Sequence, residues 1–326
     1  MIKFDKGIQV GDKLLIDPHT KRVVENVLIS HAHSDHVKIN RESKYFFSKE
    51  TKAIIESRYQ IVENSKTVAF GKKVNIGNVD LTLENSGHIL GSSSFLIESD
   101  KTIGITSDFK TQNSIIQTGA APLNCEVLLI ESTFGIPTFS FPKRESIYFE
   151  IGDWIKEKSK KGFVVLAGYS LGKAQELTAI CNEYAGITPL VHESVFDNNE
   201  VYKKSGVKLG NYLKLNHNLK DSPVLIAPPT LVNHNLQQVL EYSLKKPVFT
   251  ALATGWSFRS SYDRIFPLSD HADFPQLLDY VKQCNPKLVL TMHGYERELA
   301  NYISRRLGIP AKPLAENGQK ILAEYG

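Results

Sequence analysis

Ser30-His31-Ala32-His33-Ser34-Asp35-His36 is the stretch that decides the fold of this 326-residue chain. It continues an apolar run at 27–30 (VLIS) that is too short for a buried helix and is predicted to be a strand. Three imidazoles and a carboxylate are costly to crowd together, because protonated histidines repel one another and neutral ones need partners. A divalent cation satisfies all of them, and imidazole with carboxylate suits zinc. The stretch therefore predicts a metal site in a loop that follows a strand.

One short loop cannot close two metal sites, so further ligands are expected from other loops that follow strands. Three candidates follow predicted strands: His88 in 86–91 (SGHILG), Asp108 after the strand 102–106, and His293 after the strand 287–291. Each has an ordinary alternative when taken alone, since a lone histidine is often structural and a lone aspartate often caps a turn. Beside the histidine loop, their common place at strand ends makes each of them a predicted ligand.

The composition agrees with a folded enzyme and excludes several other classes. Hydrophobic residues make up 41% and charged residues 23%, which argues against disorder. The net charge of +4 permits a polyanionic partner without requiring one. The three cysteines (Cys125, Cys181 and Cys284) are far apart and are predicted to be reduced core thiols. The sequence has neither a signal-peptide pattern nor a long apolar run, so we expect a cytoplasmic protein with no membrane partner.

The order of predicted elements indicates an insertion. The first part is rich in short strands, whereas from residue 144 onward helices alternate with strands such as 163–167 (FVVLA), which is typical of a parallel α/β layer. Polar clusters follow strands in the first part and again in the tail, and few occur between them. We therefore predict a first domain part at 1–137, an inserted domain at 138–256, and the completion of the first domain at 257–326.

Taken together, these residues resemble the metallo-β-lactamase superfamily. Its signatures occur in order at Asp17, at the histidine loop, at His88 and at Asp108. Three further motifs resemble its β-CASP nuclease branch, and they are Glu131 in 131–135 (ESTFG, motif A), His271 in 269–273 (SDHAD, motif B) and His293 (motif C). The resemblance covers essentially the whole chain. It implies an α/β (α+β) fold, an αββα sandwich with an inserted β-CASP α/β domain, and an active site in the cleft between the two.

Within this branch, the chain is most similar to the ligase-associated DNA exonuclease-like and archaeal mRNA 3′-end processing factor-like proteins. The stretches that carry this similarity are 131–137 (ESTFGIP), 169–177 (YSLGKAQEL), 254–256 (TGW), 268–274 (LSDHADF) and 291–295 (TMHGY). A histidine at motif C is typical of the RNA-processing members, whereas Artemis-like DNA enzymes carry valine there. DNA and RNA therefore both stay open as substrates.

The resemblance also implies roles for the site residues. It implies two zinc ions, with manganese as the alternative metal. The implied ligands are His31, His33 and His88 for one ion, Asp35, His36 and His293 for the other, and Asp108 as the bridge between them. Asp35 would also orient the attacking water or take its proton. His271 would hydrogen-bond a phosphate oxygen or protonate the leaving oxygen, with Glu131 orienting it and raising its pKa, and Asp17 would support a ligand histidine from behind.

A second stretch, 168–173 (GYSLGK), superficially resembles a phosphate-binding loop. Its spacing does not fit G-x-x-x-x-G-K-[ST], and Ala174 stands where serine or threonine is required, so ATP binding is not expected. A turn from a strand into a helix can still hold a substrate phosphate on its backbone N–H groups. Ser170 and Lys173 are the candidate contacts, and an ordinary helix start is the alternative.

The predicted function is that of a zinc-dependent nuclease that hydrolyses phosphodiester bonds in single-stranded RNA or DNA. We expect an exonuclease in DNA repair or RNA processing, with repair or processing proteins as partners. The alternatives are a small-molecule metallo-hydrolase of the same superfamily and a partner-dependent RNA 3′-end processing endonuclease subunit. A catalytically inactive scaffold and a binding module without catalysis are less in keeping with a complete ligand set. Polarity of cleavage and oligomeric state stay open.

Overall fold

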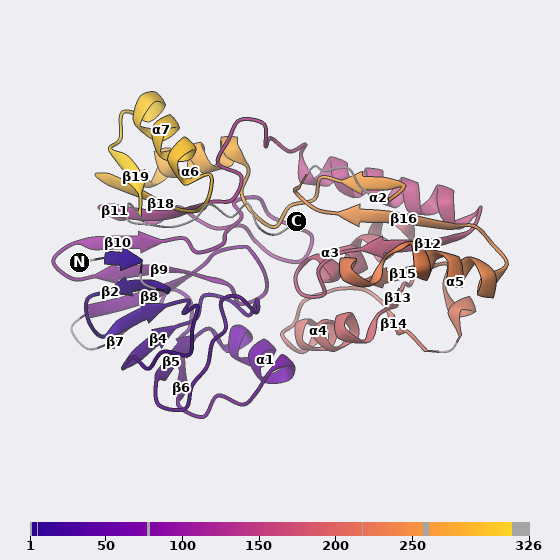
Figure 1. Cartoon of the computed structure of the whole chain (residues 1–326), viewed down its shortest axis with the longest axis horizontal. Coiled ribbons are helices and arrows are strands. Elements are labelled where there is room, and N and C mark those ends of the chain that lie inside the picture. The colour runs from indigo at the N-terminus through magenta and orange to yellow at the C-terminus, as the bar shows by residue number, and fades with distance from the viewer. Residues whose placement is uncertain (1, 5, 77–78, 217, 257–260, 315–326) are drawn as a thin grey trace. The chain divides into compact units, whose positions relative to one another are not determined.

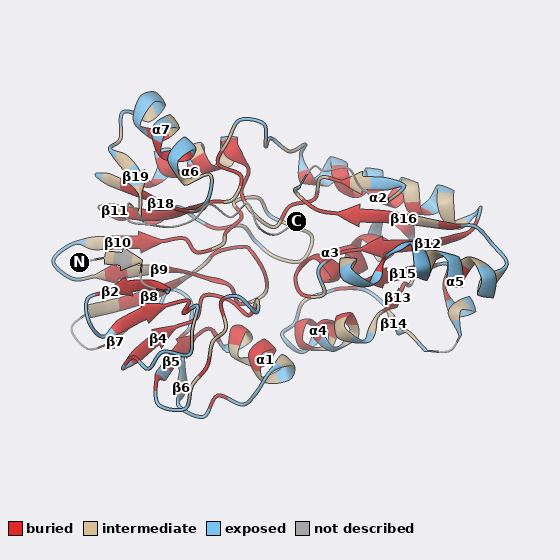
Figure 2. Cartoon of the chain, in the orientation of Figure 1, coloured by how far each residue is buried: buried red, intermediate tan, exposed pale blue. Residues whose placement is uncertain are grey.

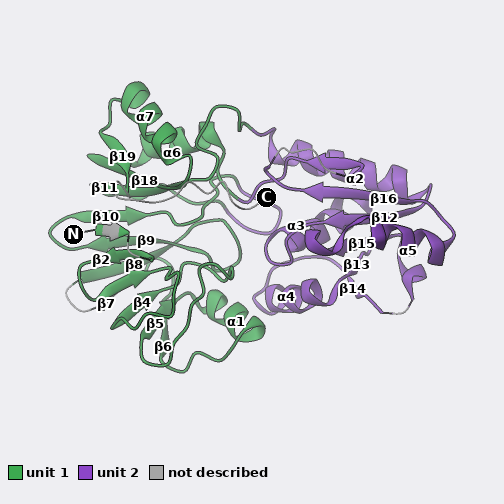
Figure 3. Ribbon diagram, in the orientation of Figure 1, with its two compact units in different colours: residues 1–112, 119–140, 271–326 green, residues 113–118, 141–270 purple. Residues whose placement is uncertain are grey.

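The computed structural model describes residues 2–4, 6–76, 79–216, 218–256 and 261–314, and the chain forms two compact units (Figure 1). Unit 1 comprises residues 1–112, 119–140 and 271–326, and unit 2 comprises residues 113–118 and 141–270 (Figure 3). The sequence places the inserted domain at 138–256. The strand at 264–266 belongs to the sheet of unit 2, and residue 257 lies outside the described residues.

The first sheet of unit 1 is formed by the beginning of the chain, and its neighbouring strands are consecutive in sequence. Its six strands are β1 (Ile2–Phe4), β2 (Ile8–Val10), β3 (Leu14–Ile16), β4 (Asn26–Leu28), β5 (Lys44–Phe47) and β6 (Ser65–Thr67). From β3 to β6 the neighbours are parallel, so the carboxyl ends of these strands meet at one edge. The histidine loop follows β4 at that edge.

The second sheet of unit 1 combines the first part of the chain with its tail. In spatial order its seven strands are β19 (Ala311–Pro313), β18 (Leu288–Gly294), β11 (Val127–Ser132), β10 (Thr102–Ile105), β9 (Ser93–Glu98), β8 (Val79–Asn85) and β7 (Lys73–Ile76). Strands β10, β11 and β18 are parallel neighbours. The tail therefore completes a sheet that the first part began, as the predicted insertion requires.

The two sheets pack face to face through one apolar cluster. Leu14, Ile16 and Leu28 come from the first sheet, and Phe95 and Leu129 come from the second. Residues of the second sheet that point the other way, such as Leu128 and Ile130, pack against the helices α6 (Phe274–Cys284) and α7 (Glu296–Leu307). This in–out alternation is what strands buried on both faces require.

Helix α1 (Lys49–Arg58) follows β5 directly and buries Ile54 and Ile55 completely. It starts at Ser48, whose side chain accepts a hydrogen bond from Thr51 N at 3.0 Å. In Figure 2 most of the strands are coloured as buried, whereas helices such as α5 and α7 also carry exposed residues. The predicted αββα sandwich is confirmed.

Unit 2 is a parallel sheet with helices on both faces. In spatial order its strands are β14 (Leu213–Lys214), β13 (Leu190–Val191), β15 (Val224–Ala227), β12 (Phe163–Ala167), β16 (Val248–Ala253) and β17 (Arg264–Phe266). Val164 and Leu166 pack with α2 (Arg144–Ser159), α3 (Lys173–Ile180) and α4 (Glu193–Lys204), whereas Phe163 and Val165 pack with α5 (His234–Leu244). The inserted α/β domain is thereby confirmed. Among the described residues, no helix combines the length and apolar character that crossing a membrane requires.

Candidate metal centre and its surroundings

The predicted ligands of unit 1 lie where neighbouring strands end. The histidine loop follows β4, His88 follows β8, and Asp108 follows β10. Strands β8 and β10 are each antiparallel to β9 and therefore run in the same direction. Their carboxyl ends consequently meet at one edge of the second sheet, which brings loops far apart in sequence to one place.

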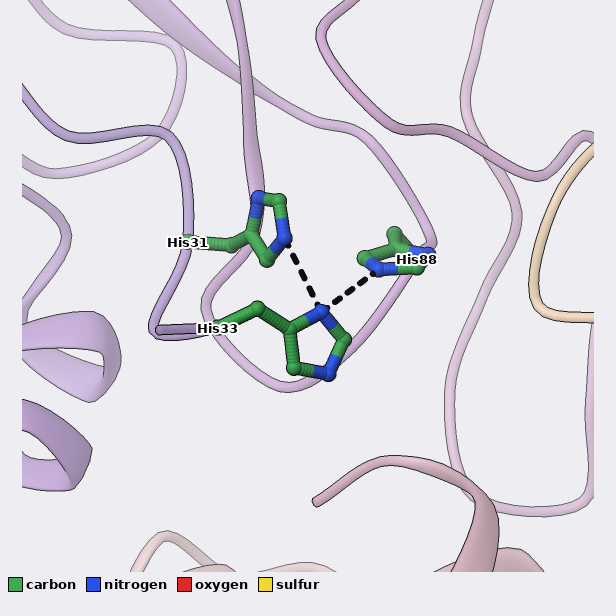
Figure 4. Close-up of side chains that lie close together, drawn as sticks. All are labelled: His31, His33 and His88. Atoms are coloured by element: carbon green, nitrogen blue, oxygen red, sulfur yellow. Dashed lines mark hydrogen bonds between the residues drawn. The ribbon is translucent and has the colours of Figure 1, made fainter. Parts of the chain in front are cut away.

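Three imidazoles form the centre of this group (Figure 4). Nδ1 of His33 lies 3.0 Å from Nε2 of His31 and 3.1 Å from Nε2 of His88. Ligand nitrogens about 2.0–2.1 Å from a tetrahedral zinc ion are separated by roughly 3.3 Å. The three ring nitrogens thus converge almost as a bound cation would require, and the donor set is one that zinc favours.

Asp108 joins this group to a second one. Its Oδ2 lies 3.7 Å from Nε2 of His31, 3.8 Å from Nε2 of His88 and 3.6 Å from Nε2 of His36. His36 Nε2 lies in turn 3.6 Å from Oδ2 of Asp35, whose side chain is 78% exposed. One carboxylate oxygen is therefore shared by the two groups, which is the position expected of a bridging ligand.

Asp17 holds the histidine loop from behind. Its Oδ1 accepts a hydrogen bond from Ser30 N at 2.7 Å, and its Oδ2 lies 3.0 Å from Nδ1 of His36. Ser107 donates to the same carboxylate at 3.3 Å. On the neighbouring ring, Ser30 Oγ contacts Nδ1 of His31 at 2.8 Å. Both rings therefore turn Nε2 toward Asp108.

The electrostatics of the group differ sharply between two of its histidines. Burial, together with the neighbouring His36 and His88, holds the pKa of His31 well below its usual value. Burial also lowers the pKa of His36, but the carboxylates of Asp17 and Asp108 outweigh that effect and raise it to about 10. A buried set of rings with such opposed tendencies is typical of a functional site.

A separate pair lies beside the cluster. Both oxygens of the Glu131 carboxylate, at the end of β11, lie 2.9 Å from Nδ1 of His271. Phe109 N donates to Glu131 Oε1 at 2.8 Å, and Thr133 Oγ1 donates to Oε2. Burial raises the pKa of Glu131, but His271 together with the hydrogen bonds from Thr133 and Phe109 outweighs it, so the pKa is lowered and the carboxylate is ionised. His271 also approaches His88, with 4.7 Å between the ring centroids.

His293 belongs to the same region but is less close to the cluster. It lies near the end of β18 with a φ of 57°, and its ring centroid is 6.5 Å from that of His36. In the part of the chain that the structure describes, three sets of side chains have ligand atoms within 4.8 Å of one another: His31 with His33 and His88, His31 with His36 and Asp108, and His88 with Asp108 and His271. Neither His293 nor Asp35 belongs to these sets, and His271, which was expected to act on the substrate, does.

The structure gives the two tentative phosphate contacts, Ser170 and Lys173, different surroundings. Lys173, the first residue of α3, is only 2% exposed, and its ammonium lies 2.9 Å from Oδ1 of Asp270. The carbonyl of Ser170 accepts hydrogen bonds from Gln175 and Asn198. Lys173 is thus paired within unit 2, and its contact with a substrate phosphate, like that of Ser170, stays a prediction.

Sequence reasoning missed several residues that fix the site. Ser107 and Thr133 were overlooked although both lie inside the recognised motifs. Ser132 was also overlooked, and its hydroxyl donates to the carbonyls of Met292 at 2.9 Å and His293 at 2.8 Å. The contacts of Ser107 and Ser132 join segments that only the folded chain makes neighbours, whereas Thr133 reaches Glu131 within the same motif.

Known proteins are similar to this chain over most of its length. A family model described as "Zn-dependent metallo-hydrolase RNA specificity domain" matches residues 264–312, which include His271 and His293. A probable DNA ligase of Opitutus terrae is 30% identical over 335 residues, covering 98% of this chain and 31% of that protein. RNase aCSPSF2 of Saccharolobus solfataricus is 25% identical, covering 91% of this chain and 75% of its own. This chain thus spans about a third of the first relative and three quarters of the second.

A solved structure agrees on the fold. A protein of unknown function from Enterococcus faecalis V583 aligns with a TM-score of 0.60 at 16% identity, over 90% of this chain and 80% of that one. The family-model match and the relatives support the metallo-β-lactamase superfamily and, within it, the β-CASP nuclease branch, which is the resemblance that the motifs indicated.

Proposed function

We propose that this protein is a metal-dependent nuclease that hydrolyses phosphodiester bonds in single-stranded nucleic acid, acting as an exonuclease. The observation that carries the proposal is the position of the Glu131–His271 pair beside the cluster. His88, Asp108 and His271 have ligand atoms within 4.8 Å of one another. A positioned proton donor is thereby next to a site suited to metal ions, which is the combination that cleavage of a phosphodiester needs.

The donor set supports two divalent cations. We assign His31, His33 and His88 to the first, and Asp35, His36 and His293 to the second, with Asp108 serving both. The shared Oδ2 of Asp108, 3.6–3.8 Å from three ring nitrogens, supports the bridge. Zinc is the proposed metal, with manganese as the alternative. When bound, two such ions would activate water near neutral pH and would neutralise charge that develops on the phosphate.

Asp17 is the proposed support of the second group. A metal-binding histidine usually has its other ring nitrogen engaged by a carboxylate or carbonyl, which fixes its orientation. The 3.0 Å separation of Asp17 Oδ2 from His36 Nδ1 fits this arrangement. The contact of Ser30 with Nδ1 of His31 does the same for the first group.

Asp35 is the proposed acceptor of a proton from the attacking water. Although the side chain is accessible, the surrounding protein partly desolvates the carboxylate, which raises its pKa. His36 and His33 outweigh that effect, so the pKa is lowered overall and the group is ionised at neutral pH. Its large exposure gives it access to water, and Oδ2 lies 3.6 Å from His36. An ionised, accessible carboxylate at the edge of the cluster suits this role.

His271 is the proposed contact to the substrate. Ionised Glu131 accepts a hydrogen bond from Nδ1, so Nε2 is the ring nitrogen that would meet a phosphate oxygen or the leaving oxygen. Proton transfer by such a group contributes about 10²–10⁴-fold to a rate. An Nδ1 held by a carboxylate suits either a metal ligand or a proton donor. We assign His271 to the substrate because the ligands assigned above complete both metal sites without it.

The names of the relatives suggest which nucleic acids to propose as substrates. One relative is named an RNase and another a probable DNA ligase, so single-stranded RNA and DNA are both proposed substrates, in RNA processing or DNA repair. Protein partners from those processes and a cytoplasmic location complete the proposal. The mildly basic balance of the chain, with a net charge of +4, suits a polyanion.

The decisive experiment is a cleavage assay on matched end-labelled single-stranded DNA and RNA, first with zinc and then with manganese. We expect mononucleotides released from one end, and their loss in His271→Ala. The label that is released first gives the polarity, and internal fragments would instead indicate an endonuclease. Absence of cleavage of both polymers in both metals would contradict the proposal and favour a small-molecule hydrolase, which a panel of thioesters and lactones would then test.

A further inference from the structure

A buried cluster of charges in unit 2 has no role in the proposed chemistry. Arg144 of α2 and Glu176 of α3 are 8% and 1% exposed, and Lys173 is 2% exposed. Arg144 Nε donates to Glu176 Oε1 at 2.7 Å, and Nη2 donates to Oε2, which makes a bidentate pair. The hydroxyl of Tyr148 donates to the same carboxylate. With Asp270 the cluster contains two positive and two negative groups and is neutral.

Donors of this cluster also reach one short segment beside it. Arg144 Nη1 donates to the carbonyl of Ser269 at 2.6 Å, and its Nη2 lies 3.4 Å from Oδ1 of Asp270. Lys173 Nζ lies 2.9 Å from the same oxygen. Ser269 and Asp270 are the last two residues of unit 2, and the next peptide bond leads to His271.

The residues on the other side of that bond are held within unit 1. Glu131 engages Nδ1 of His271 at 2.9 Å. Ala272 N donates to the carbonyl of Phe109 at 2.8 Å, and Phe109 N donates to Glu131. The four consecutive residues 269–272 are therefore each fixed by a backbone or side-chain bond, with His271 in the middle.

A contribution to the stability of unit 2 does not explain well why these charges are buried. Burying charges costs desolvation energy that their attraction repays only with good geometry, and well-packed apolar side chains often serve stability as well. Unit 2 already has apolar cores on both faces of its sheet. An apolar replacement could not form directional bonds to the Ser269 carbonyl and the Asp270 carboxylate, which lie next to His271 in the chain. Such bonds matter for catalysis because a small displacement of a reacting group can cost about 100-fold in rate.

We propose that Arg144, Lys173 and Glu176 are positioning residues for His271, and that they act through the Ser269 carbonyl and the Asp270 carboxylate. The proposal rests on the proposed function, in which His271 contacts the substrate. Glu176 orients the guanidinium of Arg144, Arg144 and Lys173 fix Asp270, and the peptide carries that constraint to His271. Removal of the constraint lowers turnover while substrate binding elsewhere is retained.

The test uses the full chain with Lys173→Met and Asp270→Asn combined, which removes one charge of each sign and leaves the Arg144–Glu176 pair in place. We expect kcat to fall about 10- to 100-fold with KM changed less than about twofold. The control combines Lys214→Met with Glu193→Gln, which removes an ion pair of 2.7 Å elsewhere in unit 2. That control is expected to retain the rate of the unaltered protein.

Adding His271→Ala separates positioning from a general structural effect. If the cluster acts through His271, the triple variant loses no more activity than His271→Ala alone. A further loss of the full 10- to 100-fold would overturn the inference, as would an unchanged rate in the double variant. Full activity of His271→Ala itself would instead refute the role of His271 in the proposed function and the inference with it.

An NMR measurement keeps the inference testable even in a protein without turnover. The imidazole signals of His271 are identified by their loss in His271→Ala. They are expected to shift in the Lys173→Met, Asp270→Asn variant and to stay in place in the control. Unshifted signals in both variants would contradict the inference without any bearing on whether the protein is a nuclease.

Discussion

Glu131 holds His271 with both of its carboxylate oxygens, each 2.9 Å from Nδ1, although the two residues are 140 positions apart in the chain. The side chain of Glu131 is only 1% exposed, and this burial raises its pKa. The imidazole of His271 and the hydrogen bonds to the carboxylate outweigh burial, so the pKa is lowered overall. Such a pair fixes the ring and decides which nitrogen carries the proton. The relationship also joins the two parts of unit 1 that the insertion separates.

Glu131→Gln should therefore impair catalysis more than stability. Glutamine keeps the shape and can still accept a hydrogen bond, but it no longer supplies the charge that stabilises a protonated His271. We expect kcat to fall about 10- to 100-fold, as for other carboxylates that orient a functional histidine. Steady-state kinetics with saturating metal provide the measurement. Glu126→Gln removes an exposed carboxylate paired with Lys287 at 2.6 Å and serves as the control; equal rates for the two variants would contradict the assignment.

Asp17→Asn should weaken metal binding and leave turnover at saturating metal largely intact. The carboxylate contacts Nδ1 of His36 and the backbone of Ser30 but no predicted substrate group. Loss of such a support typically reduces metal affinity about 10- to 100-fold. Competition with a chelator of known affinity measures the change, with Asp12→Asn on an exposed loop as control. An unaltered affinity would show that Asp17 does not support the site.

Removal of the metal by a chelator should lower the stability of the protein, because metal binding stabilises only the folded state. A ligand that binds only the folded state adds about 2.7 kcal/mol at a concentration 100 times its dissociation constant. Differential scanning calorimetry before and after dialysis against a chelator should show a lower unfolding temperature, restored by zinc. Since all the proposed ligands lie in unit 1, only one of two transitions should move if the units unfold separately. An unfolding curve indifferent to zinc would contradict the proposed site.

Much of this site was predictable because its motifs are local. The histidine loop contains four of the predicted ligands within six residues, and its chemistry leaves few alternatives to a metal. His88 and Asp108 could be added because each follows a strand, and strands running in one direction end at the same edge of a sheet. The strand at Phe163–Ala167 was predicted with its observed bounds, since a run of five apolar residues can be buried on both faces.

The remaining features depend on contacts that no local pattern records. Lys173 follows a glycine-rich turn and was interpreted as a phosphate contact, but its buried pairing with Asp270 joins residues nearly a hundred positions apart. The strand Arg264–Phe266 was assigned to the returning domain, and only its parallel register with Val248–Ala253 assigns it to the sheet of unit 2. The lysine and the strand are each placed by a contact with another segment, and the local sequence pattern does not record that contact.

The three cysteines should behave as inert core thiols. Burial raises the pKa of Cys125 to about 12 and that of Cys284 to about 11, and it also raises the pKa of the fully buried Cys181. The thiolate is the reactive form, so at pH 8 about one thiol in a thousand or fewer is ionised at a pKa near 11. Ellman's reagent should react slowly with the native protein and with all three thiols in denaturant. A thiol that reacts rapidly in the native protein would contradict this burial.

Gly87→Ala should damage the metal site from within its backbone. Gly87 has a φ of 72°, and a Cβ there would lie 2.5 Å from the carbonyl oxygen of Lys110 and 2.9 Å from Ala120 N. Both neighbours are backbone atoms and cannot move aside cheaply, so the turn that presents His88 must shift. Gly71→Ala is the matched control, because Gly71 has a φ of 69° with no atom within 4 Å of the added carbon.

The comparison separates backbone strain from the clash. Both variants lose about 1–3 kcal/mol from a residue with a side chain in the left-handed region. The clash adds about 1–3 kcal/mol at Gly87 alone, as overpacking typically does. Urea unfolding should therefore show the larger loss for Gly87→Ala, and a zinc titration should show weakened binding in that variant only. If the two variants lost equal stability and bound zinc equally, the close approach of Gly87 to Lys110 would not be what positions His88.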